Sequence, residues 1–374
     1  MAKKSGNAKV RYAVVGLGWI AQEDVLPGFS HAQGNSELVA FVSGDEVKHE
    51  ELSQKYGVKH SYTYSQYEDC LQSGLIDAVY IALPNHLHCE YTVKAAQAGI
   101  HVLCEKPMAV TENECQQMIQ AAKENNVKLM IAYRLHFDKA NMEAVKIVQS
   151  GQIGEPRIFN SVFSQQVAEG NIRLNPIEEG GGTVYDMGIY CINAARYLFQ
   201  DEPLEVRAKS ASKSEKRFAK EDEMTSAILS FPGERLATFT SSFGASKVST
   251  FQVVGTKGDL RMDSAYSYLG ELKQKITVNG ETKEQSFSAG DQFAAEIVYF
   301  SNCILNDKNP EPSGQEGLIY VHIIRAIHEA ARTGQSIEMG DFERQQRPTP
   351  EQVIQRPPLE QLPELVHAAD PSGN

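Results

Sequence analysis

Val10-Arg-Tyr-Ala-Val-Val-Gly-Leu-Gly-Trp-Ile-Ala21 is the most informative segment of the chain, because a mostly apolar run leads directly into two closely spaced glycines. Gly16 and Gly18 allow a tight turn and a close approach of backbone to a pyrophosphate, which then lies at a helix N-terminus. Such a pattern is weak alone, but here it follows the first strand of an alternating pattern and opens the first helix. The stretch therefore predicts a dinucleotide-binding loop, with Trp19 and Ile20 inside it.

Short apolar runs and polar, helix-like stretches alternate around this loop as far as about residue 132. The runs are rich in Val, Ile and Leu, as buried parallel strands are, and comprise residues 11–15, 38–42, 78–83, 101–104 and 128–132. Helices are expected between them at 46–56, 87–98 and 112–125. This order implies right-handed crossovers and a doubly wound sheet, so residues 8–134 predict a Rossmann dinucleotide-binding domain within an α/β protein.

The pattern changes after about residue 151. Strands are expected at 157–167, 204–210, 225–231, 236–243, 250–254, 259–262 and 273–278, many of them separated by turn residues such as Asn279-Gly280. Helices are expected at 188–199, 291–305 and 315–333. Residues 135–341 therefore predict an α+β domain with a large open, mostly antiparallel sheet. The proline-rich tail 342–374 is expected to extend along a surface or a neighbouring subunit without adding core.

Length, composition and charge limit the classes of function that this chain can have. A chain of 374 residues exceeds one ordinary core, and its 41% hydrophobic and 22% charged residues are those of a globular protein. The net charge of −12 argues against a nucleic-acid partner. No apolar stretch has the length of a membrane span, and no apolar segment precedes the first strand, so we expect neither a membrane anchor nor a secretory signal. The six scattered cysteines predict reduced thiols in a cytoplasm and no metal site.

The end of the second predicted strand bears on the choice of nucleotide. An acid there binds both ribose hydroxyls and repels a 2′-phosphate, whereas a small hydroxyl with a nearby cation accepts that phosphate. Ser43 and Lys48 favour NADP, while Asp45 and Glu46 favour NAD, although Asp45 is also explained as a helix cap. The balance favours NADP over NAD.

Two segments follow later strands at the carboxyl edge where open α/β sheets bind ligands. Leu83 ends one strand, and Asn85 and His88 follow it; they are expected at the nicotinamide end, although Pro84-Asn85 is also a good helix start. Glu105 and Lys106 follow the next strand. A partly desolvated lysine there hydrogen-bonds a substrate oxygen and stabilises an alkoxide as hydride leaves the carbon, with Glu105 orienting it. The alternative is a surface ion pair at a turn.

Asp186 and Tyr190 stand four residues apart at the start of a predicted helix, behind the triple glycine 180–182, so their side chains are expected on one face. A tyrosine beside a lysine acts as an acid/base on a hydroxyl, because the positive charge favours its ionised form. Taken alone, Asp186 is equally explained as a helix-start acid and Tyr190 as a core aromatic.

Together these segments resemble the glucose–fructose oxidoreductase / inositol dehydrogenase / rhizopine-catabolism (Gfo/Idh/MocA) family over about residues 10–340. The resemblance rests on residues 14–18, Leu83-Pro84-Asn85, Cys104-Glu105-Lys106-Pro107-Met108, Ala132-Tyr133-Arg134, Gly180-Gly181-Gly182 and Asp186-Met187-Gly188-Ile189-Tyr190-Cys191. Glu105-Lys106-Pro107 in this position is highly specific. Many members carry histidine where Tyr190 stands, so the tyrosine points to the glucose–fructose oxidoreductase branch and its NADP-dependent aldose dehydrogenase relatives.

The resemblance implies Lys106 as catalytic lysine, Tyr190 as acid/base and Asp186 as its supporting carboxylate. It also implies that Ser43 and Lys48 hold the 2′-phosphate, although Asp45 stands where that branch has asparagine, and that Arg134 and Arg173 lie near the cofactor and the cleft. Homodimers or homotetramers built through the second-domain sheet are expected. Substrate contacts are expected from four residues: Lys106, Arg173, Asp186 and Tyr190.

The function predicted is hydride transfer between NADP and a sugar. The enzyme is expected to oxidise an aldose at C1 to its lactone or to act on a sugar carbonyl, as a dehydrogenase or as an aldose–ketose or aldose–aldose oxidoreductase with tightly bound NADP. The alternatives are a NAD-dependent inositol-type dehydrogenase and a non-catalytic, cofactor-sensing binding protein. Retention of Lys106, Asp186 and Tyr190 argues against the sensor, since a sensor does not need the three together.

Overall fold

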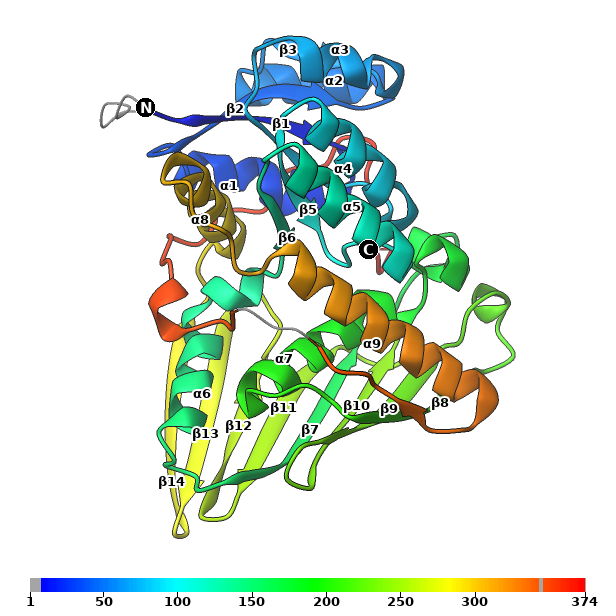
Figure 1. Ribbon diagram of the computed structural model, residues 1–374, viewed down its shortest axis with the longest axis vertical. Coiled ribbons are helices and arrows are strands. Elements are labelled where there is room, and N and C mark those ends of the chain that lie inside the picture. Colours follow the sequence, from blue (N-terminus) through cyan, green and yellow to red (C-terminus); the bar gives the residue numbers. More distant parts are fainter. Residues whose placement is uncertain (1–7, 343–345, 374) are drawn as a thin grey trace. The chain divides into compact units, whose positions relative to one another are not determined.

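The computed structural model describes residues 8–342 and 346–373, which form two compact units (Figure 1). Unit 1 combines the chain up to Arg134 with Gly290–Leu318 and Ile354–Asp370. Unit 2 holds Leu135–Ala289, Ile319–Val353 and the chain from Pro371. Two segments that are remote in sequence therefore join the N-terminal unit. No helix in the described part of the chain has both the length and the apolar character needed to cross a membrane.

A six-stranded parallel sheet forms the centre of unit 1, in the order β3-β2-β1-β4-β5-β6. The strands are β1 (Val10–Val15), β2 (Ser36–Val42), β3 (His60–Tyr62), β4 (Ala78–Ile81), β5 (His101–Glu105) and β6 (Leu129–Ala132). The central strands are almost wholly buried, as strands covered by helices on both faces must be. The predicted Rossmann sheet is confirmed. The sequence did not reveal β3, because this short, half-exposed edge strand has no apolar run.

Some helices of unit 1 begin where the sequence provides a side-chain cap. The helices of this unit are α1 (Leu26–His31), α2 (Glu46–Tyr56), α3 (Tyr67–Gln72), α4 (His88–Gln97), α5 (Glu112–Glu124) and α8 (Gln292–Leu305). Asp45 caps α2 by accepting a bond from the Lys48 amide, and Thr111 with Glu114 forms a capping box at α5. α8 belongs to this unit because its Ser301 hydroxyl lies 2.7 Å from the Tyr12 hydroxyl of β1.

Unit 2 is built on a nine-stranded sheet in the order β14-β13-β12-β11-β7-β10-β9-β8-β15. Its strands are β7 (Pro156–Ser164), β8 (Glu205–Ala211), β9 (Met224–Phe231), β10 (Arg235–Ser242), β11 (Val248–Gly255), β12 (Gly258–Asp263), β13 (Glu271–Val278), β14 (Glu281–Ser288) and β15 (Ile337–Glu338). β7 and β10 pair in parallel and the other neighbours run antiparallel, which confirms the predicted mostly antiparallel sheet.

Helices cover one face of this sheet (Figure 1). They are α6 (Lys139–Gln149), α7 (Ile189–Phe199) and α9 (Gly314–Thr333), of which α9 begins in unit 1 and continues in unit 2. The sequence analysis did not propose α6, although Asp138 caps it and its buried residues recur at helical spacing. On the opposite face, alternate residues of β7, β9 and β10 are exposed or half-buried.

Candidate functional site

The predicted phosphate loop is built around two glycines that meet different demands. Gly16 has φ +91°, and a Cβ on it would lie 2.6 Å from the Ala82 carbonyl oxygen, so a side chain is excluded by both strain and contact. A Cβ on Gly18 would meet nothing within 4 Å. The loop thus presses against β4 at Gly16 and leaves open space at Gly18. The chain then enters a π-helical turn, Ala21–Val25, that leads into α1.

The residues after β2 form a compact turn at the start of α2. Ser43 is buried, and its hydroxyl oxygen accepts a bond of 3.3 Å from the Asp45 amide. Asp45 Oδ1 in turn accepts the Lys48 amide at 3.2 Å. Asp45 is therefore a helix cap, as one of the sequence interpretations proposed, and Ser43, Asp45 and Lys48 lie together at one strand end. Lys48 itself is half-buried.

The segment after β4 separates Asn85 from His88. Leu83 is buried and lies against Gly16, where its Cδ2 atom would be 2.9 Å from a Cβ. Asn85 is half-buried at the start of a 3₁₀ turn, Asn85–Leu87. His88 is fully buried, and its ring nitrogens lie 2.8 Å from the carbonyl oxygens of Leu83 and Pro107. This geometry favours a structural role for His88, because both ring nitrogens join the two strand-end loops.

Lys106 follows β5 and is half-buried, and the bond between it and Pro107 is cis. Its amide donates to Glu105 Oε2 at 3.2 Å. Glu105 itself is buried, and its Oε1 accepts the Tyr80 hydroxyl at 2.7 Å. The acid that precedes Lys106 is thus fixed from β4, and Lys106 is held at a rigid strand end.

A second buried acid, Glu296 of α8, meets the same tyrosine at 2.8 Å. Burial raises the pKa of Glu296 well above its usual range, and the nearby Glu105 charge adds to the shift. Burial also raises the pKa of Glu105, but the Lys106 charge, the Tyr80 bond and Arg134 oppose that rise. Since a phenol carries one proton, a protonated Glu296 completes the chain to Tyr80 and on to Glu105. Sequence reasoning missed Tyr80 and Glu296, because neither has a local signal.

Arg134 lies in the same part of unit 1. It is buried, donates to the Gln292 side-chain oxygen, and places its guanidinium 6.0 Å from the centre of the Phe293 ring. Its charge also lowers the pKa of the buried carboxyls. Arg134 therefore balances the buried acids behind Lys106, in addition to the cofactor role that the sequence predicted.

In unit 2 the triple glycine positions Arg173. A Cβ on Gly181 would lie 1.7 Å from the Asn175 carbonyl oxygen, so only glycine allows the two backbones to approach this closely. The Gly182 amide donates to the Arg173 carbonyl at 2.8 Å. Arg173 Nε donates to Asp186 Oδ2 at 2.8 Å, with both side chains about one-fifth exposed. The structure thus brings two predicted site residues together in a paired, half-buried arrangement.

Tyr190 is the second residue of α7 and stands four residues after Asp186, which lies in the π-helical turn Val184–Gly188. The Tyr190 ring packs edge-on against Phe163 at 5.6 Å and tilted against Tyr266 at 5.9 Å. Tyr266 is fixed in turn by a 2.7 Å bond between its hydroxyl and that of Ser161. Two aromatic neighbours therefore pack against the ring of Tyr190. Phe163 and Tyr266 are supporting residues that the sequence did not single out.

Comparison with known proteins identifies the family. The model of the oxidoreductase family with an NAD-binding Rossmann fold, GFO_IDH_MocA, matches residues 10–133, and that of the GFO/IDH/MocA C-terminal domain matches residues 142–261. The chain belongs to the Gfo/Idh/MocA family. Within this family, a D-xylose 1-dehydrogenase [NADP(+)] of Haloarcula marismortui is 33% identical over 336 residues, covering 88% of this chain and 93% of its own.

Two further Gfo/Idh/MocA relatives cover similar lengths. A D-xylose 1-dehydrogenase (NADP(+)) of Haloferax volcanii is 28% identical over 88% of this chain and 99% of its own. The crystal structure of an aldose-aldose oxidoreductase from Caulobacter crescentus, complexed with glycerol, is 35% identical with a TM-score of 0.84. It covers 88% of this chain and the whole of that one.

The residues of unit 1 fit a dinucleotide. The space beside the Gly18 backbone is open, so a phosphate group can approach the backbone there. Gly18 also precedes the helical turn that leads into α1, and helix starts favour phosphate. Ser43 and Lys48 provide a hydroxyl and a cation at the end of β2, where the adenosine ribose lies in this fold. At the next two strands of the same carboxyl edge, Leu83 and Asn85 follow β4, Glu105 is the last residue of β5, and Lys106 follows it.

Proposed function

We propose that this protein is an NADP-dependent sugar oxidoreductase that acts on a CH–OH group, with an aldose C1 as the favoured position. The observation that carries the proposal is the presence of Lys106, Asp186 and Tyr190 in a Gfo/Idh/MocA chain whose relatives include NADP-dependent xylose dehydrogenases and an aldose-aldose oxidoreductase. Ser43 and Lys48 after β2 support the choice of NADP over NAD.

When bound, the nicotinamide supplies the acceptor or donor of hydride. Lys106 is proposed to donate a hydrogen bond to the reacting oxygen and to stabilise its negative charge. Tyr190 is proposed to take the proton of that hydroxyl during oxidation and to return it during reduction. Asp186, paired with Arg173, is proposed to orient the substrate and Tyr190. Trp19, Ile20, Asn85 and Arg134 are proposed to serve the cofactor, and Arg173 the substrate.

The test is a panel of aldoses and ketoses with NADP and NAD, followed by the absorbance of reduced nicotinamide. We expect turnover with one or more aldoses and a preference for NADP, because the 2′-phosphate gains the Ser43 hydroxyl and the Lys48 charge. A spectrum of the purified protein reports whether nucleotide remains bound between turnovers. Bound nucleotide with no turnover of any sugar would favour the sensor instead, and turnover of inositols with NAD would favour the inositol-type dehydrogenase.

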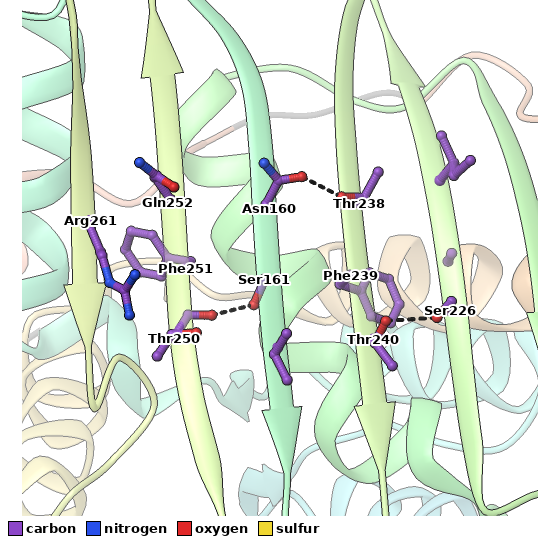
Figure 2. A pocket seen from close by; sticks show the side chains of 13 residues that line it. Asn160, Ser161, Ser226, Thr238, Phe239, Thr240, Thr250, Phe251, Gln252 and Arg261 are labelled. Carbon is purple, nitrogen blue, oxygen red and sulfur yellow. Dashed lines mark hydrogen bonds between the residues drawn. The ribbon is translucent and has the colours of Figure 1, made fainter.

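We also propose that the exposed face of the nine-stranded sheet is the contact between copies of this chain. Its outward side chains include Ile158, Val162, Ile228 and Leu236, which are 39–47% exposed. Figure 2 shows a hollow on this face, where Thr238 donates to Asn160 at 2.6 Å and the Ser226 and Thr240 hydroxyls lie 2.7 Å apart. A mixed apolar and hydroxyl-rich sheet face of this kind favours burial against a second sheet.

Val162→Glu tests the proposed oligomer. The charge would be buried without a partner in a sheet-to-sheet interface, so we expect the dimer or tetramer to dissociate to monomer. Light scattering after gel filtration measures the mass. Leu269→Glu is the matched control, because Leu269 is 42% exposed and lies between β12 and β13, outside this face. An unchanged mass for Val162→Glu would argue against the sheet as the interface.

A cytoplasmic location is proposed from the thiols. All six cysteines are free and buried, as the sequence predicted, and such thiols persist best in a reducing compartment.

A further inference from the structure

The C-terminal strap, which we define as residues 354–370, runs along unit 1 and is drawn in red in Figure 1. None of its side chains is buried, so apolar packing does not hold it in place. Hydrogen bonds do: the Arg356 carbonyl accepts the Asp291 amide at 3.2 Å, and the Glu364 carbonyl accepts Lys55 Nζ at 3.3 Å. The strap is thus fixed to unit 1 at several separate points.

The most specific of these points joins the strap to the phosphate loop. Gln22 Nε2 donates to the Val366 carbonyl at 2.9 Å, and Gln22 Oε1 accepts the Val366 amide at 2.7 Å. The same Nε2 also donates to the Leu17 carbonyl, within the phosphate loop, at 2.9 Å. Gln22 is 1% exposed, so these bonds are shielded from water. The Gln22 side chain therefore bridges the Val366 backbone and the phosphate loop at Leu17.

The next residue of the strap reaches the end of β2. His367 Nδ1 lies 3.0 Å from Asp45 Oδ2, and since a carboxylate only accepts, the histidine nitrogen is the donor. The bond lowers the pKa of Asp45, with further contributions from the Lys48 amide and charge. In the part of the chain that the structure describes, no residue bonds to the other ring nitrogen, Nε2, and the His367 side chain is 60% exposed.

This arrangement resolves a conflict of charge at the end of β2. Ser43 and Lys48 suit a 2′-phosphate, but Asp45 between them carries a negative charge that repels it. The Lys48 amide uses one oxygen of Asp45 and His367 uses the other. When the imidazole carries its second proton, it offsets the carboxylate charge and has an N–H donor on Nε2. Lys48 is half-buried, and its charge contributes to the lowered pKa of Asp45, so a further positive charge lies at this strand end.

We propose that the C-terminal strap completes the binding site for the 2′-phosphate of NADP. His367 offsets the charge of Asp45, so that the end of β2 accepts the dianionic phosphate. The inference rests on the proposed use of NADP and adds a residue 322 positions away in sequence from Asp45. Gln22 is the positioning residue, because it holds Val366, and therefore His367, against the phosphate loop.

Binding of the nucleotide fragments 2′,5′-ADP and 5′-AMP tests the proposal, because the two differ only by the 2′-phosphate. Isothermal titration of the full-length protein measures both affinities without any sugar. His367→Ala is expected to weaken 2′,5′-ADP about tenfold, the loss of one charge-assisted bond, and to change 5′-AMP less than about twofold. His60→Ala is the matched control, since His60 begins β3, at the amino end of its strand.

A second variant separates the strap from the histidine. Gln22→Leu removes both bonds to Val366 and keeps His367, so a selective loss for 2′,5′-ADP there supports the positioning role. Three results for His367→Ala would overturn the inference: an equal loss of affinity for both nucleotides, no loss of affinity, or tighter binding. Tighter binding would mean that the strap obstructs the site. If the unaltered protein binds the two nucleotides equally, the proposed use of NADP itself fails. The failure of the strap proposal alone looks different: the protein would prefer 2′,5′-ADP over 5′-AMP to the same extent with and without His367.

Discussion

Tyr190→Phe is expected to lower kcat by about a hundredfold or more, because the variant loses the proton acceptor for the substrate hydroxyl. The ring of Tyr190 packs against Phe163 and Tyr266, and these contacts do not involve the hydroxyl. Phenylalanine therefore keeps the packing, and the melting temperature should stay close to that of the unaltered protein. Steady-state turnover of the best sugar from the panel, with NADP, measures the effect.

The control for this variant is Tyr185→Phe, five residues earlier on the same helical segment, where the ring stacks on His328 at 5.5 Å. We expect near-normal turnover in the control. A Tyr190→Phe enzyme that keeps most of its activity would remove Tyr190 from the mechanism and leave Lys106 as the proposed proton donor. Binding of 2′,5′-ADP should be unchanged in both variants, since both tyrosines belong to unit 2.

Lys106→Met is expected to cost about a hundredfold to a thousandfold in kcat, the usual effect of removing one donor to a developing oxyanion. Methionine matches the length of the lysine stem without its charge, so packing at the end of β5 should survive. The Lys106 charge also lowers the pKa of Glu105, so the variant is expected to raise that pKa further. Turnover across a pH series tests both effects.

Lys94→Met is the control, because Lys94 is a partly exposed lysine of α4 paired with Glu90 at 2.8 Å. Surface pairs of this kind contribute little, so its activity should be normal. Rescue of Lys106→Met by added alkylamine would support a role at the reacting oxygen. Full activity of Lys106→Met without amine would remove Lys106 from the mechanism and favour the alternative interpretation of the motif, a surface ion pair at a turn.

The sequence was most informative where the backbone itself carries the signal. The glycines at 16 and 18, the cap at Asp45 and the box at Thr111 all report local conformation, and the structure has a turn or a helix start at each. It was less informative where polar residues form regular structure. Almost all residues of β14 (Glu281–Ser288) are exposed, so this strand lacks the alternation of apolar and polar residues that reveals a half-buried strand.

Supporting residues of the site were hidden for a different reason. Glu296 meets Tyr80 from a helix 216 residues away, and Val366 meets Gln22 from 344 residues away. Nothing in the neighbourhood of either residue indicates its partner, because such contacts depend on how the chain returns to the first sheet. The Arg173–Asp186 pair is intermediate: the triple glycine signals a tight approach but does not say to what.

Short-range patterning and specific motifs were enough to predict the two-sheet plan and the phosphate loop, and to mark Lys106, Asp186 and Tyr190 as candidate catalytic residues. Three features became visible only in the folded chain: α8 and the strap return to unit 1, Arg173 pairs with Asp186, and His367 lies at Asp45. A hydrogen bond or ion pair depends on how close two side chains lie in space, whereas a motif depends only on the spacing of residues along the chain.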